Sequence, residues 1–313
     1  MNTPGSKSGS GLQSIGFGCS HITGGFEARS NVRLLRSAYD LGLRHFDTAP
    51  LYGHGTSEEV VGDAFRGDRH KITIATKVGI PHGTLSQKTQ LIRFLASPIR
   101  RWTPGISKLA TRKIYSTKPV TDFSLSSIER SLENSLTKLK TDYVDILLLH
   151  EVCLEDISDE LLGKLQGLVS EGKVRRLGIG TTIQNISGIR GGGHDFEVYQ
   201  RPWSILVPDE HLFADRYQIF HGGIASGLEP VSEKLRADPE FRCRLQELTG
   251  LEFRSTDDVA KILLLSAIAA NPKGLALFSS RVKSRVSAYM KFATKGLSVE
   301  KASLIVREIR SCL

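Results

Sequence analysis

Four side chains with complementary acid–base chemistry stand close to the ends of short apolar runs. Asp47, Lys77 and His150 each end such a run, and Tyr52 follows Asp47 in the next loop. A phenol donates its proton poorly at neutral pH because its pKa is near 10, but a nearby ammonium favours phenolate and is expected to lower the pKa of Tyr52. The set is suited to proton transfer to a carbonyl oxygen, with Asp47 holding Lys77 charged and His150 either orienting the carbonyl or sharing the proton.

Taken singly, each of these residues is better explained by a structural role. Asp47 would cap a loop, Tyr52 would be a rim aromatic, Lys77 would be solvated and His150 would lie in the core. Their joint placement at successive strand ends favours a common site, because the ends of neighbouring strands in a barrel converge on one mouth.

Eight short apolar or β-branched runs alternate with longer helical patterns, which indicates a parallel sheet with helices packed outside it. The predicted strands are Ser14–Gly18, Arg44–Asp47, Ile72–Lys77, Tyr143–His150, Val174–Gly180, Phe196–Gln200, Tyr217–Phe220 and Leu275–Phe278. The fold class expected from this count is α/β, a single-domain (β/α)8 TIM barrel.

Apolar residues three and four positions apart predict the intervening helices. One stripe consists of Ile128, Leu132, Leu136 and Leu139, and another of Leu161, Leu165, Leu168 and Val169. Thr56 and Ser126, each followed three positions later by a glutamate, have capping-box spacing, while Gly42 and Gly172 stand where helix C-caps would fall.

The 313 residues fit one large barrel, residues 13–313, preceded by a Gly/Ser/Thr-rich tail, residues 1–12, which is expected to be flexible. The basic segment 80–123 is too long for an ordinary loop after the third strand. It is equally compatible with a solvated excursion and with a lid over the active site. Residues 230–255 are expected to add a helix before one that starts near Thr256.

A net charge of +9 raises the prior for an anionic partner such as a phosphorylated cofactor. No aromatic nucleic-acid motif accompanies the basic residues, so no nucleic-acid partner is expected. The longest apolar stretch is too short to cross a bilayer, and no signal-peptide pattern opens the chain, so a cytoplasmic protein without a membrane partner is expected. The cysteines, which stand far apart, suggest neither a disulfide framework nor a metal site; they are Cys19, Cys153, Cys243 and Cys312.

Other site chemistries find less support in the sequence. A Rossmann fingerprint needs three glycines at the end of the first strand, and residues 16–21 (GFGCSH) lack the third. His150 and Glu151 begin like a zinc-protease motif, but Leu154 occupies the place of the second histidine, so no metal is expected. Lys77 could also act as a Schiff-base nucleophile, an alternative that the residues leave open.

The sequence resembles the aldo-keto reductase family in four separated motifs that occur in order. Residues 42–49 (GLRHFDTA), with Tyr52-Gly53 and Ser57-Glu58, are similar to the first signature of that family. Thr76-Lys77, residues 145–150 (DILLLH) and residues 172–175 (GKVR) are similar to later blocks. The likeness runs from about residue 14 to 295 and is thin over 80–123 and 201–255.

The resemblance implies reduction of an aldehyde or ketone by hydride transfer from NADP(H), with Tyr52 as general acid and Asp47, Lys77 and His150 beside it. It assigns Gln200 to the nicotinamide carboxamide, Phe220 to stacking beneath that ring, and the start of the last helix to the adenosine 2′-phosphate. The cofactor contacts expected in this way are Gly18, Asp47, Thr181, Gln200, Phe220, His221, Gly222, Ser279, Ser280, Arg281, Ser284 and Arg285.

Three departures from the family pattern affect cofactor contacts. Gly180-Thr181 replaces the usual Ser-Asn after the fifth strand, Tyr289 replaces an asparagine near the adenine, and the segment 220–223 (FHGG) is unusual. An NADP(H)-binding regulatory or accessory subunit with little turnover is the alternative function. The sequence leaves the carbonyl or alcohol substrate, the direction of reaction and the oligomeric state open.

Overall fold

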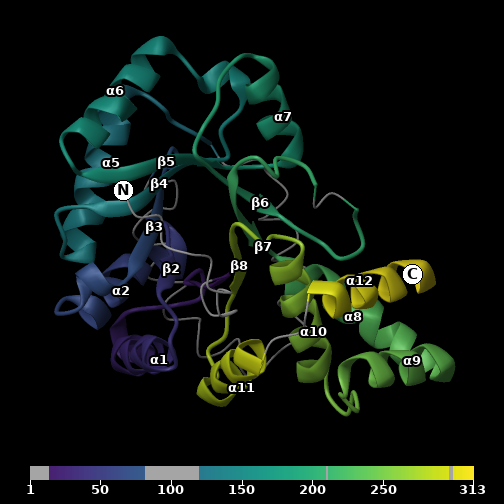
Figure 1. The fold of residues 1–313 in the computed structure, drawn as a ribbon. Coiled ribbons are helices and arrows are strands. Elements are labelled where there is room, and N and C mark those ends of the chain that lie inside the picture. The colour runs from purple at the N-terminus through teal and green to yellow at the C-terminus, as the bar shows by residue number, and fades with distance from the viewer. Residues whose placement is uncertain (1–13, 82–119, 209–210, 296–298) are drawn as a thin grey trace, which may run out of the picture.

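Eight parallel strands close into a barrel in which each strand pairs with its neighbours in sequence and β8 pairs with β1 (Figure 1). The computed structural model describes residues 14–81, 120–208, 211–295 and 299–313. The strands are β1 (Ile15–Gly18), β2 (His45–Asp47), β3 (Thr73–Val78), β4 (Val144–His150), β5 (Val174–Gly180), β6 (Val198–Pro202), β7 (Tyr217–His221) and β8 (Leu275–Phe278). All eight predicted strands are confirmed to within two residues at each end, and the chain is a single (β/α)8 domain.

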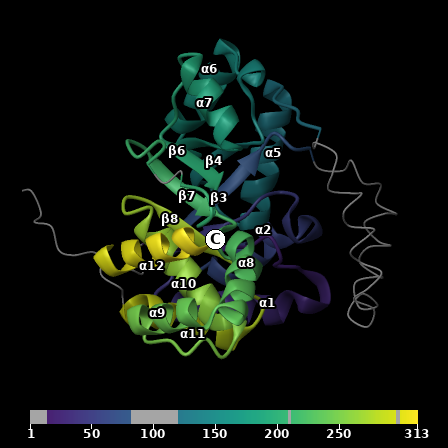
Figure 2. The same cartoon turned by 90° about the vertical axis from the view of Figure 1, so that its right-hand side faces the viewer.

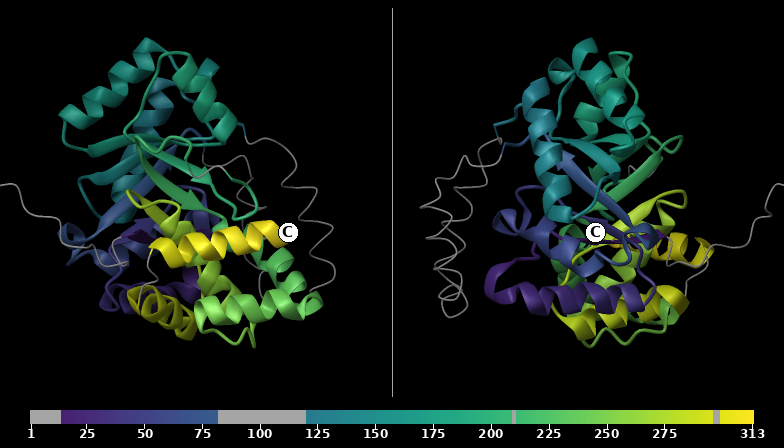
Figure 3. Two further views of the ribbon diagram at one scale, coloured as in Figure 1. Left: turned by 45° about the vertical axis from the view of Figure 1, so that its right-hand side comes forward. Right: turned by 90° about the vertical axis from the view of Figure 1, so that its left-hand side faces the viewer.

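In the described residues, one α-helix follows each of the first five strands: α1 (Ala28–Asp40), α2 (Ser57–Phe65), α5 (Leu125–Leu139), α6 (Asp159–Ser170) and α7 (Ile183–Gly191). Three helices separate β7 from β8, namely α8 (Gly223–Ala237), α9 (Pro239–Thr249) and α10 (Thr256–Ala269), and β8 is followed by α11 (Lys283–Lys295) and α12 (Val299–Cys312). The described residues between β6 and β7 form no helix. Figures 2 and 3 show α8 to α12 gathered on one side of the barrel, away from α5 to α7.

The sequence correctly predicted the buried stripe of α5 and the C-terminal ends of α1 and α6. The predicted stripe of α5 is buried along its length. Gly42 and Gly172 have φ angles of 100° and 77°, and each closes its helix with the paired backbone hydrogen bonds of a Schellman motif. Glycine adopts this left-handed conformation without the steric penalty that a side chain brings.

The two capping-box predictions were wrong. Thr56 is the N-cap of α2, but its hydroxyl donates to the carbonyl of Gly53 instead of accepting from the helix. Ser126 lies inside α5, which begins one residue earlier, after Ser124. The expectation for residues 230–255 is confirmed, because α9 is an added helix and α10 begins at Thr256, although Pro230 itself lies inside α8.

Alternation along the strands separates an inner core from an outer one. Six residues fill the barrel interior, whereas a much larger cluster packs the strands against the helices. The interior residues are Ala75, Ile146, Leu148, Val198, Ile219 and Leu275. Because side chains point inward at every second position, residues 47, 77, 150, 200 and 221 continue these inward rows at the carboxyl ends of their strands.

Several expectations concern residues that the structure does not describe. The predicted tail, residues 1–12, lies outside the described ranges, and so does the candidate lid apart from residues 80–81 and 120–123. Both stay predictions. Within the described residues, no helix is both long and apolar enough to cross a membrane. All four cysteines are free thiols.

Candidate active site

Asp47 and Lys77 form a buried ion pair at the mouth of the barrel. The Lys77 ammonium donates to Oδ1 of Asp47 at 2.8 Å and to the carbonyl oxygen of Thr48 at 3.0 Å. Only 1% of Lys77 and 3% of Asp47 is exposed. Burial lowers the pKa of Lys77, but Asp47 and Tyr52 raise it more, so the net pKa is above the ordinary value. Lys77 is therefore a permanent cation at physiological pH.

Tyr52 is held over this pair by a short 3-10 helix, Tyr52–Gly55. The next residue, Gly53, has a φ of 56°, and a Cβ there would lie 1.8 Å from the carbonyl oxygen of Ile22. Only glycine fits this approach. The Lys77 nitrogen lies 4.9 Å from the centroid of the Tyr52 ring, so the phenol and the ammonium share one site as expected.

The expected net lowering of the Tyr52 pKa is wrong. Burial raises this pKa and outweighs the lowering by Lys77, with Asp47 adding a further upward contribution. The main physical reason is that burial removes the water that would stabilise a phenolate, and Asp47 also offsets part of the field of the ammonium. Tyr52 is consequently a protonated phenol at neutral pH, and it can donate its proton.

His150 ends β4 and places its imidazole edge-on to the Tyr52 ring, with the ring centroids 6.4 Å apart and an interplanar angle of 86°. Burial first, and then the charge of Lys77, lower the pKa of His150 to about 3, while Asp47 opposes the shift. A neutral imidazole can donate one hydrogen bond to a carbonyl oxygen without bringing a second cation into the mouth. The structure thus gathers all four predicted catalytic residues.

Gln200 lies at this site, where its side-chain amide is hydrogen-bonded to Asp47. Its side-chain nitrogen donates to Oδ2 of Asp47 at 2.6 Å, from β6 on the other side of the barrel. The sequence assigned Gln200 to the nicotinamide carboxamide and gave no sign of this contact. The only signal in the sequence is that residues 47 and 200 both fall on the inward-facing positions of their strands.

Phe220 does not face the mouth, which corrects its assignment beneath a nicotinamide ring. It is 1% exposed and belongs to the outer core, where the Trp203 ring stacks on it at 6.0 Å and 5°. The Arg201 guanidinium lies 4.3 Å from its centroid. The reason is that side chains alternate along a strand: Ile219 points into the barrel, so the next residue, Phe220, points outward.

His221, one residue further along β7, is the side chain on the inward row. Its side chain is exposed, yet the surrounding mouth lowers its pKa to about 4, by desolvation first and then through Lys77 and Arg201, while Asp47 opposes the shift. Its charge would also affect His150, so the two imidazoles are close enough to interact electrostatically. His221 therefore shares the mouth with the catalytic group.

The expected phosphate cluster lies where β8 leads into α11. Ser279 donates to the carbonyl of Gly18 at 2.6 Å, and a Cβ on Gly18 would lie 2.7 Å from that hydroxyl. The hydroxyl of Ser280 accepts from the backbone of Val282 at 3.1 Å. Ser279 is consequently committed to closing the barrel, a role that its place in a phosphate cluster did not suggest.

The other three residues of this cluster are exposed. Arg281 and Ser284 are exposed at the start of α11. Arg285 forms an ion pair with Asp257 of α10 at 2.8 Å, so its charge is partly neutralised. Arg281 makes no ion pair within the described ranges, which leaves its guanidinium available to an anion.

The remaining expected contacts surround the mouth. Thr181 is buried after β5, where its hydroxyl accepts from Asn185 at 2.8 Å. Gly222 has a φ of 77° and is the N-cap of α8, so the free backbone N–H groups of this helix start lie just after the carboxyl end of β7. Sequence reasoning missed Glu58, which is buried and accepts from Thr76 at 2.7 Å, tying α2 to β3 beside Lys77.

Known proteins similar to this chain include many reductases. The family model described as the aldo/keto reductase family matches residues 14–218. The uncharacterized oxidoreductase YqkF of Bacillus subtilis is 28% identical over 271 residues, which cover 82% of this chain and 76% of that protein. An aryl-alcohol dehydrogenase of Phanerodontia chrysosporium, whose name specifies NADP(+), is 27% identical over 242 residues, covering 72% of this chain but only 55% of that protein.

Solved structures share the fold at lower identity. The aldo-keto reductase AKR11C1 from Bacillus halodurans, in its holo form, superposes with a TM-score of 0.69 at 21% identity, covering 96% of this chain and 91% of that one. An aldo-keto reductase from Klebsiella pneumoniae in complex with NADPH gives a TM-score of 0.63 at 21% identity, covering 95% and 91%.

Proposed function

Because this chain belongs to the aldo/keto reductase family of oxidoreductases, we propose that it reduces an aldehyde or ketone to an alcohol with NADP(H), using Tyr52 as general acid. The observation that carries the proposal is the protonated phenol of Tyr52 beside the buried pair of Lys77 and Asp47. A positioned acid of this kind typically contributes about 10² to 10⁴ in rate.

The proton transfer follows from the charges at the mouth. A carbonyl oxygen between Tyr52 and His150 would accept hydrogen bonds from both, and His150 is neutral, so it orients without repelling. As the oxygen becomes an alkoxide, Tyr52 releases its proton. The Lys77 ammonium then stabilises the phenolate, and Asp47 keeps Lys77 from acting as a nucleophile by holding it protonated.

The residues present fit NADP(H) at its phosphate end. The helices α8 and α11 begin within a few residues of the ends of β7 and β8, so two helix N-termini lie at the carboxyl end of the barrel. Arg281 at the second of these is exposed and without an ion pair in the described residues. These groups, with Ser284, would hold the cofactor phosphates.

The nicotinamide end fits with two changes from the family pattern. His221 occupies the inward position that Phe220 does not, and it would contact the ring. Gln200 would reach the carboxamide only by sharing or leaving Asp47. When bound, the reduced nicotinamide supplies the hydride, and the residues above position the carbonyl and deliver the proton.

A direct assay tests this function. Purified protein is mixed with NADPH and a panel of aliphatic and aromatic aldehydes and ketones, and the loss of NADPH absorbance is followed. Turnover with at least one carbonyl compound supports the proposal. NADPH binding without oxidation across the panel would instead support an accessory subunit, and trapping of substrate by borohydride would support imine chemistry at Lys77.

A further inference from the structure

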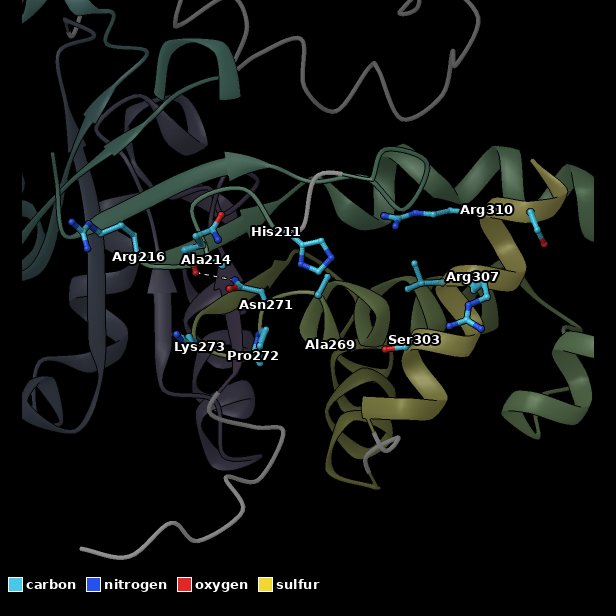
Figure 4. A pocket seen from close by; sticks show the side chains of 14 residues that line it. His211, Ala214, Arg216, Ala269, Asn271, Pro272, Lys273, Ser303, Arg307 and Arg310 are labelled. Carbon is cyan, nitrogen blue, oxygen red and sulfur yellow. Dashed lines mark hydrogen bonds between the residues drawn. The ribbon is translucent and has the colours of Figure 1, made fainter. Parts of the chain in front are cut away.

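A cavity lies at the end of the barrel opposite Tyr52, Lys77 and His150 (Figure 4). It has a volume of about 840 Å³, within the size range of small-molecule sites. Arg216 precedes β7 and Lys273 precedes β8, so one wall is formed where these strands begin. The other wall is α12, which contributes Arg307 and Arg310. The cavity is therefore separate from the mouth, where strands end.

The lining of this cavity is strongly basic. Arg216, Lys273, Arg307 and Arg310 contribute four guanidinium or ammonium groups, and His211 adds an imidazole, whereas no aspartate or glutamate is among the lining residues described. In Figure 4 the first two lie on one side, the two α12 arginines on the other, and His211 between them. The positive charge is consequently concentrated at two separated ends.

Two of these cations are already partnered by the protein. Arg216 pairs with Asp195 and Asp215, and Arg310 donates to the carbonyl oxygen of Ile205 at 2.8 Å. Lys273 and Arg307 are both exposed at the cavity, and neither makes an ion pair in the described residues. One uncompensated cation thus stands at each end.

The cavity wall is fixed in place by a buried amide. The Asn271 side-chain nitrogen donates to the carbonyl oxygens of Gln218 and Leu275, both at 2.9 Å, so it ties the residue before Pro272 to both flanking strands. Because Lys273 follows within two residues of this anchor, its backbone is held in position without a ligand. Preformed sites lose less entropy on binding than mobile ones.

We propose that this cavity binds an elongated small molecule carrying a phosphate at each end. Lys273 would contact one phosphate and Arg307 the other, since charge-assisted hydrogen bonds favour a phosphate at an uncompensated cation. Between them, Ala269, Ala270 and Val306 offer an apolar surface for the connecting carbon chain. This site is independent of the proposed carbonyl reduction, because none of its residues belongs to the catalytic mouth.

Calorimetric titration with hexanediol bisphosphate tests the site. This probe has two terminal phosphates and no carbonyl group, so it cannot be reduced. We expect one molecule to bind per chain, and Lys273→Ala and Arg307→Ala each to weaken binding at least about tenfold, as expected for losing one charge-assisted contact. Hexyl monophosphate should bind more weakly than the bisphosphate and lose affinity in only one of the two variants.

Lys301→Ala is the matched control, because it removes one exposed cation from α12 outside the cavity. It should leave binding unchanged. No binding to wild type, equal loss in Lys301→Ala, or full binding in the double variant Lys273→Ala/Arg307→Ala would each overturn the proposal. Circular dichroism confirms that the variants fold, and NADPH oxidation in the same samples reports separately on the mouth.

Discussion

The side-chain amide of Gln200 donates to Oδ2 of Asp47 at 2.6 Å, across the barrel from the strand that carries the aspartate. Lys77 donates to the other carboxylate oxygen at 2.8 Å. Asp47 is thereby held on both sides in a buried setting, which fixes the orientation of its carboxylate. The charge of Lys77, and through it the chemistry of Tyr52, depends on this arrangement.

Replacing Tyr52 with phenylalanine should lower kcat by at least about 10²-fold, because the proton donor is lost. Binding of NADPH should change little, since the ring is kept. Stopped-flow turnover and fluorescence titration of NADPH measure the two effects. Tyr39→Phe, on α1 away from the mouth, is the control and should have wild-type kcat. Normal turnover in Tyr52→Phe would remove this residue from the mechanism.

Lys77→Met should reduce both turnover and stability. The remaining Asp47 charge would be buried without its cation, which typically costs about 3 to 5 kcal/mol of unfolding free energy. The double variant Lys77→Met/Asp47→Asn should regain part of that stability but none of the activity. Urea unfolding and kcat separate these effects. If stability were unchanged in Lys77→Met, the ion pair would not be as buried as the structure has it.

The rate of carbonyl reduction should be constant through neutral pH. Tyr52 is the proposed acid, and burial raises its pKa above the ordinary phenol value of about 10. Activity should therefore fall only as pH rises past that value, where the proton is lost. His150, with a pKa of about 3, should produce no acidic decline above about pH 5. A decline in kcat between pH 6 and 8 in the pH–rate profile would contradict this assignment.

Cofactor preference should depend on Arg281 rather than on Arg285. Arg281 is exposed and has no ion pair in the described residues, so Arg281→Ala should weaken NADPH binding about tenfold or more and leave NADH unaffected. Arg285 is paired with Asp257 at 2.8 Å, and Asp257→Asn should free it and tighten NADPH. Fluorescence titration with both cofactors checks this. Equal losses for NADPH and NADH would argue against a 2′-phosphate site at α11.

Stability should fall as pH is lowered from about 6.5 toward 4. His45 is buried, which lowers its pKa to about 4, whereas the unfolded chain binds the proton near 6.5. The unfolded state therefore gains protons first, at about 1.4 kcal/mol per pH unit for each such histidine. Urea unfolding of His45→Asn should show a smaller pH slope than wild type, and the exposed His70→Asn should match wild type. Identical slopes in all three proteins would rule out His45 as a source.

The sequence by itself determined the barrel and predicted the four candidate catalytic residues at its mouth. Periodic apolar runs gave the strand count, and motif positions at strand ends gathered Asp47, Tyr52, Lys77 and His150, since parallel strands in a barrel must end at one mouth. These conclusions depend on local pattern and on topology, both of which are readable along the chain. Gly42 and Gly172 were predictable for the same reason, because a helix end needs a left-handed residue wherever it occurs.

Only the tertiary structure decided which way each side chain points and in which direction burial and the neighbouring charges shift its pKa. A shift of one position puts Phe220 into the outer core and His221 into the mouth, and no motif marks that parity. The net pKa of Tyr52 depends on burial against two opposite charges, which are contributed by different strands. The basic cavity, likewise, joins β7 and β8 to α12 across about ninety residues of sequence. These properties depend on contacts between residues far apart in the sequence, and such contacts exist only once the chain has folded.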